Sequence, residues 1–422
     1  MAARSKTGGA TSPTQTVDDR AGGRSYAVLR HRDYRLLWQA EFASNFGTQM
    51  QRVAIAWQIY LLTGDALKLG ILGLVRFAAI LLVGLVGGVL ADQRDRRRLL
   101  FASQLCLAAS SGVLALLAAT GTTTPVAIYA ITLVAASLTA IGGPARQAFI
   151  PSLVPRAEIA AAMTLNTLAM QIATVTGPVV AGWLIGRVDV TPIYVLDALS
   201  FVGVAAAALA IRARPPAGGP TRGALHAAVE GMVFLRQSPV LLGVMAADFA
   251  ATFFGAATVL MPIFASEVLG VGPKGLGFLY AAPAIGAVLG SVAMTLGRMP
   301  RYPGRGVLLA IVLYGATVAG FGLSRTVWLS LLLLAIGGAA DATSMAMRAA
   351  IRNLVTPDEL RGRVAATHSM FAMGGPQLGE FEAGVAARVL GAGPSVVLGG
   401  LGTMAAAGAV AYLAPAIRRY KV

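Results

Sequence analysis

Residues 87–100 read GGVLADQRDRRRLL and separate two long apolar segments. The stretch carries four arginines and two aspartates, whereas the segments on either side are almost uncharged. Two membrane helices joined by a short basic loop have this pattern, because positive residues concentrate in the cytoplasmic loops of membrane proteins. The stretch therefore predicts a protein that crosses a membrane several times. A positive anchor with no further role is the alternative interpretation of its charges.

The composition supports a membrane protein. Of the 422 residues, 56% are hydrophobic and only 12% are charged, which is too apolar for a soluble chain of this length. The net charge of +16 lies mostly on arginines in short loops, without the aromatic interleaving of a nucleic-acid surface. Cys106 is the only cysteine, so the chain has no disulfide framework. We find no catalytic, nucleotide-binding or metal-ligand motif, and we expect no enzyme activity, cofactor or metal.

Apolar segments of about 20 residues, the length that crosses a bilayer, recur along the chain. Twelve such spans are predicted, at roughly 35–62, 69–91, 99–119, 125–147, 159–186, 192–212, 239–262, 275–297, 306–323, 327–348, 361–388 and 394–415. If the N-terminus is cytoplasmic, most Lys and Arg fall on the cytoplasmic side. Both termini are therefore expected in the cytoplasm.

The chain repeats itself. The sequence AEFA at 40–43 returns as ADFA at 247–250, and the Leu-Gly pair at 69–70 returns at 276–277. These repeats predict an all-α membrane protein of twelve helices in two pseudo-symmetric six-helix bundles. The domains expected are a disordered cytoplasmic tail (1–25), a first bundle (26–212), a cytoplasmic linker with an amphipathic helix (213–238) and a second bundle (239–422).

The basic loop resembles the signature Gly-x-Leu-Ala-Asp-Arg-x-Gly-Arg-Lys-x-x-Leu, which the major facilitator superfamily carries between its second and third helices. Gln93 and Asp95 depart from that signature, and the residues that fit it are Gly88, Leu90, Ala91, Asp92, Arg96, Arg97 and Leu100. Three further stretches, at 29–38, 144–151 and 360–364, resemble the bacterial enterobactin exporters and their drug-efflux relatives. The resemblance covers nearly the whole chain after residue 25.

This resemblance implies a substrate site between the two halves near the membrane midplane. It also implies a conformational latch in which Asp92 meets the start of the span at 361–388, with Gly88, Arg96 and Arg97 in the same loop. Gly177, Pro178 and Gly182 resemble an element of proton-coupled exporters, with Ala181 in place of a glycine. Simple helix packing is the alternative role of that element.

Charged residues at membrane depth are costly and are therefore candidates for function. Glu41 and Asp248 occupy matching repeat positions, and we expect them on opposite walls of the cavity, with Arg52 and Asp341 also in it. There the two acids would carry a proton or bind a cationic group. The alternative is that Glu41 pairs locally with an arginine and that Asp248 hydrogen-bonds within its own bundle.

Two further expectations concern residues nearer the outer membrane surface. Arg76 is predicted to pair with Glu380 or Glu382 in an outer gate, unless each of them faces water instead. Asp197, near an outer helix end, is predicted to be an interfacial charge.

The function predicted is secondary active export, by alternating access and proton antiport, of a small amphipathic molecule such as a siderophore or a drug. The partners expected are that molecule, protons and the lipid bilayer, for a monomer in a bacterial inner membrane. A metabolite importer on the same fold and a membrane sensor that does not transport are the alternatives.

Overall fold

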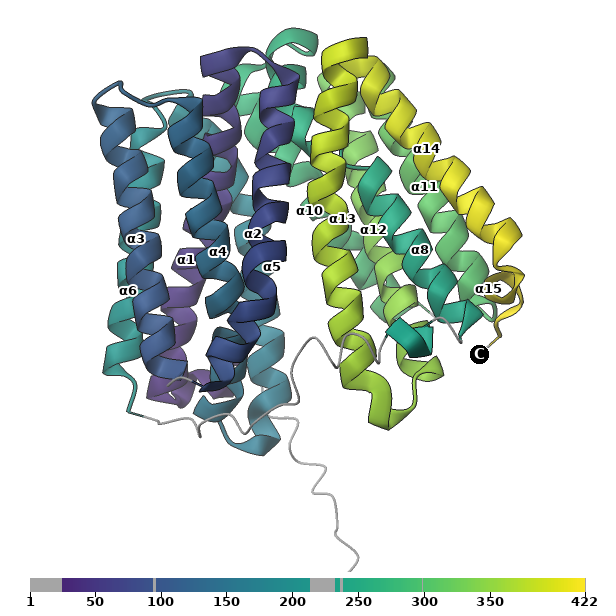
Figure 1. The fold of residues 1–422 in the computed structure, drawn as a ribbon, viewed down its shortest axis with the longest axis horizontal. Coiled ribbons are helices and arrows are strands. Elements are labelled where there is room, and N and C mark those ends of the chain that lie inside the picture. The colour runs from purple at the N-terminus through teal and green to yellow at the C-terminus, as the bar shows by residue number, and fades with distance from the viewer. Residues whose placement is uncertain (1–24, 94–95, 213–231, 236–237, 298, 422) are drawn as a thin grey trace, which may run out of the picture.

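The structure is a computed structural model that describes residues 25–93, 96–212, 232–235, 238–297 and 299–421. Side chains at 25–26, 84–96, 144–145, 148, 366 and 370 are outside this description. The described chain is almost entirely helical and contains no strand. Its helices form two bundles that stand side by side (Figure 1).

The first bundle contains the helices from the N-terminal half of the chain. Thr124 caps one of them by accepting a hydrogen bond from the Ala127 amide, and Pro125 follows at the first helical position, where its missing amide proton costs nothing. Gly64 ends another with a φ of 59°, a left-handed conformation that glycine adopts without strain. The helices are α1 (Arg32–Thr63), α2 (Ala66–Gln93), α3 (Arg96–Ala119), α4 (Pro125–Phe149), α5 (Ile159–Ile185) and α6 (Thr191–Ala210).

The second bundle repeats this arrangement with one change. Its first span, predicted as one helix over 239–262, breaks after α8 (Pro239–Phe254) and continues through η4 (Ala257–Leu260), α9 (Met261–Ile263) and η5 (Phe264–Val268), which is a π-helix. The helices that follow are α10 (Gly272–Leu296), α11 (Pro303–Leu323), α12 (Val327–Val355), α13 (Arg361–Leu390), α14 (Ala392–Leu413) and α15 (Pro415–Arg419).

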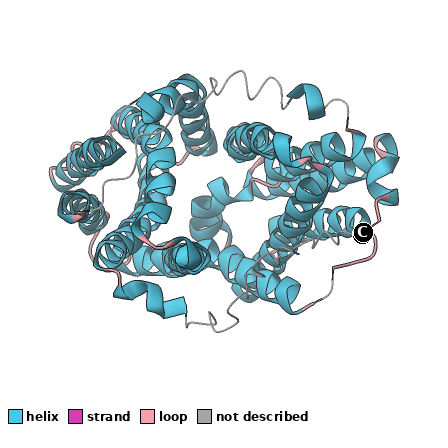
Figure 2. Cartoon of the chain, turned by 90° about the horizontal axis from the view of Figure 1, so that it is seen from below, coloured by secondary structure: helices cyan, strands magenta, loops and turns pink. Residues whose placement is uncertain are grey.

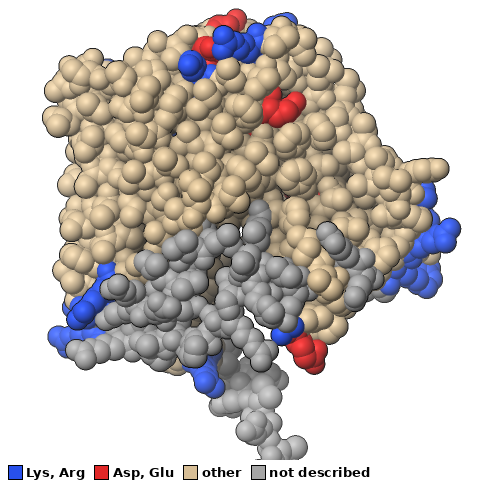
Figure 3. Space-filling view, in the orientation of Figure 1, with Lys and Arg blue, Asp and Glu red and all other residues tan. Residues whose placement is uncertain are grey.

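Ten segments of the described chain are long and apolar enough to cross a membrane. Two more helices, α1 and α13, are 32 and 30 residues long but more polar, and they are not among the ten. The full count of twelve spans stays a prediction. On the face drawn in Figure 3, charged side chains gather at the edges and leave a broad uncharged band, as a protein surrounded by lipid requires.

The two ends of the molecule differ. At the end where α1 begins, here called the basic end, lie Arg97, Arg212, Arg305 and Arg418; at the other, here called the turn end, tight turns such as Gly64 connect the helices. The two bundles diverge toward the basic end (Figure 1), which faces the viewer in Figure 2.

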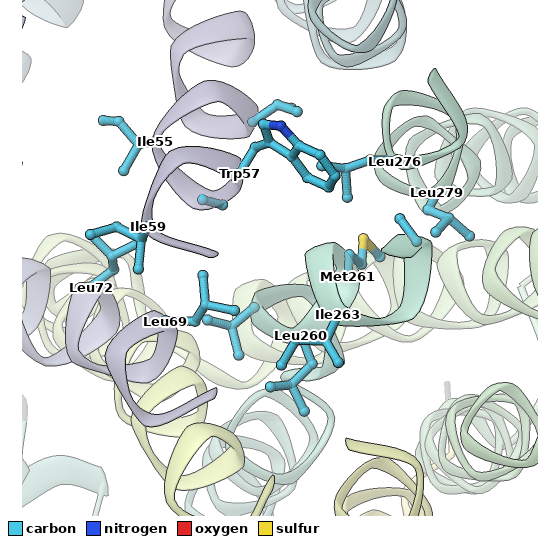
Figure 4. Packing of buried hydrophobic residues seen from close by; sticks show 14 of the residues in the cluster. Ile55, Trp57, Ile59, Leu69, Leu72, Leu260, Met261, Ile263, Leu276 and Leu279 are labelled. Carbon is cyan, nitrogen blue, oxygen red and sulfur yellow. The ribbon is translucent and has the colours of Figure 1, made fainter. Parts of the chain in front are cut away.

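The two halves share a hydrophobic core only at the turn end of the described structure. There Trp57 and Leu69 of the first half pack with Leu260, Met261 and Leu276 of the second (Figure 4). Toward the basic end each half has separate clusters, one around Tyr34 and Phe149 and others around Val307 and Leu241. The structure is therefore closed between the halves at the turn end.

Candidate functional site

A cavity of about 380 Å³ lies between the two halves, near the middle of the helices. Most of its lining is apolar or weakly polar, from both halves. The charged residues that line it are Arg52, Arg76, Asp341 and Glu380, and its neutral polar residues include Gln49, Thr174, Tyr280 and Tyr314. A mostly apolar cavity with a few polar groups is the usual form of a small-molecule site.

Arg76 on α2 and Glu380 on α13 form an ion pair across the two halves, with 3.2 Å between Arg76 NH1 and Glu380 Oε2. The helices approach closely here because Gly73 has no side chain: a Cβ on it would lie 2.6 Å from the Cβ of Glu380. Of the two predicted partners of Arg76, the structure thus selects Glu380. Glu382 is partly exposed and forms no ion pair with a described residue.

Arg52 on α1 is exposed, although it lies deep in the molecule, because its side chain faces the cavity. It forms no hydrogen bond or ion pair with any described residue. The groups that act on it electrostatically are Arg76, Glu380 and the phenol of Tyr280. Arg52 is thus a cation at membrane depth without a direct partner in the described part of the chain.

Asp341 on α12 belongs to a charged network at the second half's side of the cavity. Arg348 lies about two helical turns further along α12. Its guanidinium is 3.4 Å from Asp341 Oδ1 and 3.0 Å from Oδ1 of Asp248 on α8. His368 Nδ1 on α13 is 3.7 Å from Asp248. The Arg348 and Asp248 side chains are 4% and 9% exposed, whereas that of Asp341 is 41% exposed and contacts the cavity.

A matching pair occurs in the first half. Arg146 on α4 is 3.0 Å from Glu41 on α1, and the Glu41 side chain is only 3% exposed. Its other carboxylate oxygen, Oε1, is buried and has no hydrogen-bond partner among the described residues. Neither Glu41 nor Asp248 lines the cavity, so the structure places each acid inside its own half rather than across from the other.

The antiporter-like element lies on the side of α5 that meets the other half. A Cβ on Gly182 would lie 2.4 Å from the carbonyl oxygen of Pro273, and a Cβ on Gly277 would lie 2.5 Å from that of Pro178. Gly177 instead faces α1, where a Cβ would lie 2.9 Å from the Cβ of Gln49. Two of its three residues thus allow α5 and α10 to pack backbone to backbone.

The predicted latch falls mostly outside the description. The surroundings of Gly88 and the side chains of Asp92 and Arg96 are not described. Arg97 is described, and it donates hydrogen bonds to the carbonyl oxygens of Ala208, at 2.7 Å, and Leu209. Arg97 therefore satisfies carbonyls at the end of α6, which otherwise lack partners within the helix.

Asp197 corrects the sequence-based expectation of an interfacial charge. It is fully buried within the first half, where its Oδ2 accepts a hydrogen bond of 2.7 Å from Ser111 on α3. Gly47 on α1 makes the room, because a Cβ there would lie 2.9 Å from Asp197 Oδ1. Counting residues from the end of α6 gives the approximate position of Asp197 along the helix. It does not give the face of the helix on which Asp197 lies.

The sequence analysis gave a local arginine partner for Glu41 only as the alternative, and it identified neither Arg146 nor Arg348 as the partners of the two acids. Both arginines lie toward the end of the fourth helix of their half, and a comparison of the basic residues of α4 and α12 would have drawn attention to them. No group of three or more potential metal ligands occurs among the described residues.

Comparison with known proteins agrees with a membrane transporter. A family described as transmembrane secretion effectors matches residues 23–420. Enterobactin exporter EntS of Escherichia coli O1:K1 / APEC is 27% identical over 377 residues, which cover 89% of this chain and 86% of that protein. Its counterpart in Shigella boydii serotype 18 is 28% identical over the same shares of the two chains.

Solved transporter structures share the fold. The nucleoside transporter NupG superimposes with a TM-score of 0.76 at 13% identity, over 90% of this chain and 100% of that one. An inward-facing, occupied bacterial homologue of the lysosomal transporter Spinster gives a TM-score of 0.71 at 16% identity, over 94% and 98%.

The predicted all-α fold of the major facilitator type is confirmed by these structures, and the families indicate a transporter rather than an enzyme. The protein is thus a multi-pass membrane transporter of a small molecule. The chain belongs to the transmembrane secretion effector family of the major facilitator superfamily, within which it resembles the enterobactin exporters.

Proposed function

We propose that the protein is a secondary active exporter that moves a small amphipathic molecule out of the cytoplasm in exchange for protons. The observation that carries the proposal is the cavity, which both halves line and which the hydrophobic core closes at one end only. Alternating access needs this arrangement: a site at the midplane, with the halves rocking about it. The similarity to enterobactin exporters along 89% of the chain supports the direction of transport.

The basic end is the cytoplasmic end in this proposal. Arg97, Arg98, Arg212, Arg305 and Arg418 lie there, and the positive-inside rule assigns such an end to the cytoplasm. Both termini are then cytoplasmic, in a bacterial inner membrane. The structure accordingly corresponds to the inward-facing state, because the halves are joined at the turn end and have separate cores at the basic end.

The Arg76–Glu380 pair serves as part of the outer gate. It joins α2 and α13, which together with α5 and α10 form the most extensive contacts between the halves. Opening the outer side requires this pair to separate, and buried opposite charges attract strongly in a poorly hydrated site. The loop at 87–100 acts at the other end as the latch of the outward-facing state, through Asp92.

Proton coupling uses the acid–arginine pairs within the halves. Protonating Asp248 or Glu41 would neutralise the carboxylate and remove its attraction to Arg348 or Arg146, which lie 3.0 Å away on a neighbouring helix. Breaking a buried pair costs about 3–5 kcal/mol when one partner stays charged, so protonation and helix position are energetically coupled. Asp341 contacts both Arg348 and the cavity, and it provides the route for the proton from water.

The test uses inside-out membrane vesicles with an imposed pH gradient, acidic inside. Enterobactin and ethidium are the probes, one a siderophore and the other a drug. We expect accumulation of at least one of them that nigericin abolishes. A Glu41→Gln, Asp248→Asn double variant, compared at equal membrane abundance, should still bind the probe but lose uphill accumulation.

Two results would overturn the proposal. Probe movement in the opposite direction, out of inside-out vesicles, would identify an importer. Accumulation that is unaffected by nigericin, with the Glu41→Gln, Asp248→Asn double variant fully active, would remove the proton from the mechanism. Enterobactin is chosen because the relatives are named for its export. Ethidium is chosen because it has an apolar aromatic body like enterobactin but lacks the acidic hydroxyl groups of enterobactin.

A further inference from the structure

We propose that Arg52 is the receptor for an anionic group of the transported molecule, so that the cavity selects amphipathic organic acids. The inference rests on the proposed function in one respect, namely that this cavity is the transport site. It names the chemical class of the substrate, which follows from the charges that line the cavity and from how they are paired.

The first argument concerns charge balance on one wall of the cavity. Arg52, Arg76 and Glu380 act on one another there and on the phenol of Tyr280. Glu380 contacts Arg76 directly, at 3.2 Å, whereas Arg52 forms no ion pair with any described residue. Two guanidinium groups thus share one carboxylate, and the cluster lacks one negative charge. An unpaired charge at membrane depth is costly, and a bound anion would supply the missing partner.

The second argument concerns the direction and exposure of Arg52. Its side chain is exposed to the cavity rather than enclosed by protein, so its hydrogen-bond donors are available to a ligand. A guanidinium carries five such donors in a planar fork that matches carboxylate and phosphate oxygens. The hydroxyl of Tyr280, which also lines the cavity and has no partner among the described residues, can add a further donor to the same anion.

The third argument concerns the rest of the cavity. On the side of the second half, Asp341 is the charged residue of α12 that lines the cavity, and its side chain is 41% exposed even though Arg348 lies 3.4 Å away. An anionic group is therefore attracted to the Arg52 side and repelled from the Asp341 side, which fixes the orientation of the molecule. Its apolar body lies against residues such as Val53, Leu72 and Met261. These features together describe an acid with an apolar or aromatic body.

The experiment measures binding rather than transport. Purified protein in lipid nanodiscs is titrated calorimetrically with two pairs of probes that differ in charge but hardly in shape: 2-naphthoate against 2-naphthamide, and naphthalene-2-sulfonate against naphthalene-2-sulfonamide. Empty nanodiscs give the blank for partitioning into lipid. We expect each acid to bind wild-type protein at least about tenfold more tightly than its amide, the factor of one charge-assisted hydrogen-bonded pair.

Substitutions then assign that preference to one side chain. In Arg52→Gln the acid and the amide should bind within about twofold of each other, whereas Arg52→Lys should keep a preference for the acid because it keeps the charge. Arg325→Gln is the matched control: it removes one exposed arginine at the turn end, outside the cavity. Size-exclusion profiles and circular dichroism establish that each variant is folded. If Arg52→Gln is not folded, Arg52→Met, which also removes the charge, takes its place with the same expected loss of preference.

Three outcomes overturn the proposal: amides that bind wild type as tightly as both acids, an unchanged acid preference in Arg52→Gln, or a loss of preference in Arg325→Gln equal to that in Arg52→Gln. The proposed function fails separately. If the acid preference depends on Arg52 but a pH gradient moves neither enterobactin nor ethidium, the anion site is supported and proton-coupled export is not.

Conversely, vesicles with the Arg52→Gln variant could accumulate enterobactin like wild type while the purified variant keeps the acid preference. Export is then supported and the anion site is not.

Discussion

Arg348 lies 3.0 Å from Asp248, and this relationship between an acid on the first helix of a half and an arginine near the end of its fourth recurs between Glu41 and Arg146, also at 3.0 Å. The acids fall at matching positions of the internal repeat, and each arginine lies toward the end of the fourth helix of its half. The repeat has thus kept a charge interaction between corresponding helices, and not only the helices themselves.

The stability of these pairs can be tested by removing one or both charges. Arg146→Met should lower the free energy of unfolding by about 3–5 kcal/mol, because it leaves the carboxylate of Glu41 buried and unpaired. Adding Glu41→Gln should restore most of that loss. Thermal unfolding in detergent, followed by size exclusion, measures both. If the double variant is as unstable as the single one, the loss comes from packing of the Arg146 side chain and not from the pair.

The gate prediction concerns the pair between the halves. Arg76→Glu and Glu380→Arg should each reduce efflux at least about tenfold, because each places like charges about 3 Å apart across α2 and α13. The double exchange should recover a substantial part of the activity. Efflux is measured at matched membrane abundance. Glu382→Gln is the control on the same helix; a loss there as large as in the Glu380 variant would argue against a gate specific to Arg76 and Glu380.

The glycine contact between α5 and α10 predicts a steric effect on the transport cycle. Gly182→Ala places a methyl group 2.4 Å from the carbonyl oxygen of Pro273, so the turn end cannot close as it does here. We expect the equilibrium to shift about tenfold toward states open at that end, a cost of about 1–3 kcal/mol. Distances between spin labels at the ends of α5 and α10 report the shift. Gly203→Ala, where no atom lies within 4 Å of the added carbon, should leave them unchanged.

The latch remains a prediction from the sequence alone. Asp92→Asn should leave the protein inserted and abundant but should reduce transport severely, because a neutral amide is attracted less to the positive end of a helix than a carboxylate is. Efflux at matched abundance tests this, with Asp95→Asn in the same loop as the control. Near-normal transport by the Asp92 variant would exclude the latch.

How far the sequence predicts this structure depends on the kind of question. The apolar segments locate the helices well, because a bilayer demands about 20 apolar residues whatever the protein. The pairing of Arg76 with a glutamate of α13 followed from equal depth in the membrane. Depth could not choose between Glu380 and Glu382, which lie two residues apart and therefore on different faces of the helix.

The same limit explains where the prediction for Glu41 and Asp248 differs from the structure. Their positions along the helices were correct, but the faces they occupy were not, since each points into its own bundle and not into the cavity. In a membrane protein hydropathy says little about rotation, because lipid, core and cavity all favour apolar residues. The faces are set by partners such as Arg146, which lie far away in sequence.

The interruption after α8 has a consequence for how the cavity is to be studied. Gly255 and Ala257 leave the regular helix where they line the cavity, and the hydroxyl of Tyr314 donates a 2.8 Å hydrogen bond to the Gly255 carbonyl. The continuous α1, in the matching place, keeps its peptide groups in the helix. Part of the cavity wall is therefore peptide rather than side chain. Alanine scanning cannot delete a backbone carbonyl, so it will underestimate the contribution of this part of the cavity wall to binding. Replacing single amide bonds by esters would measure that contribution.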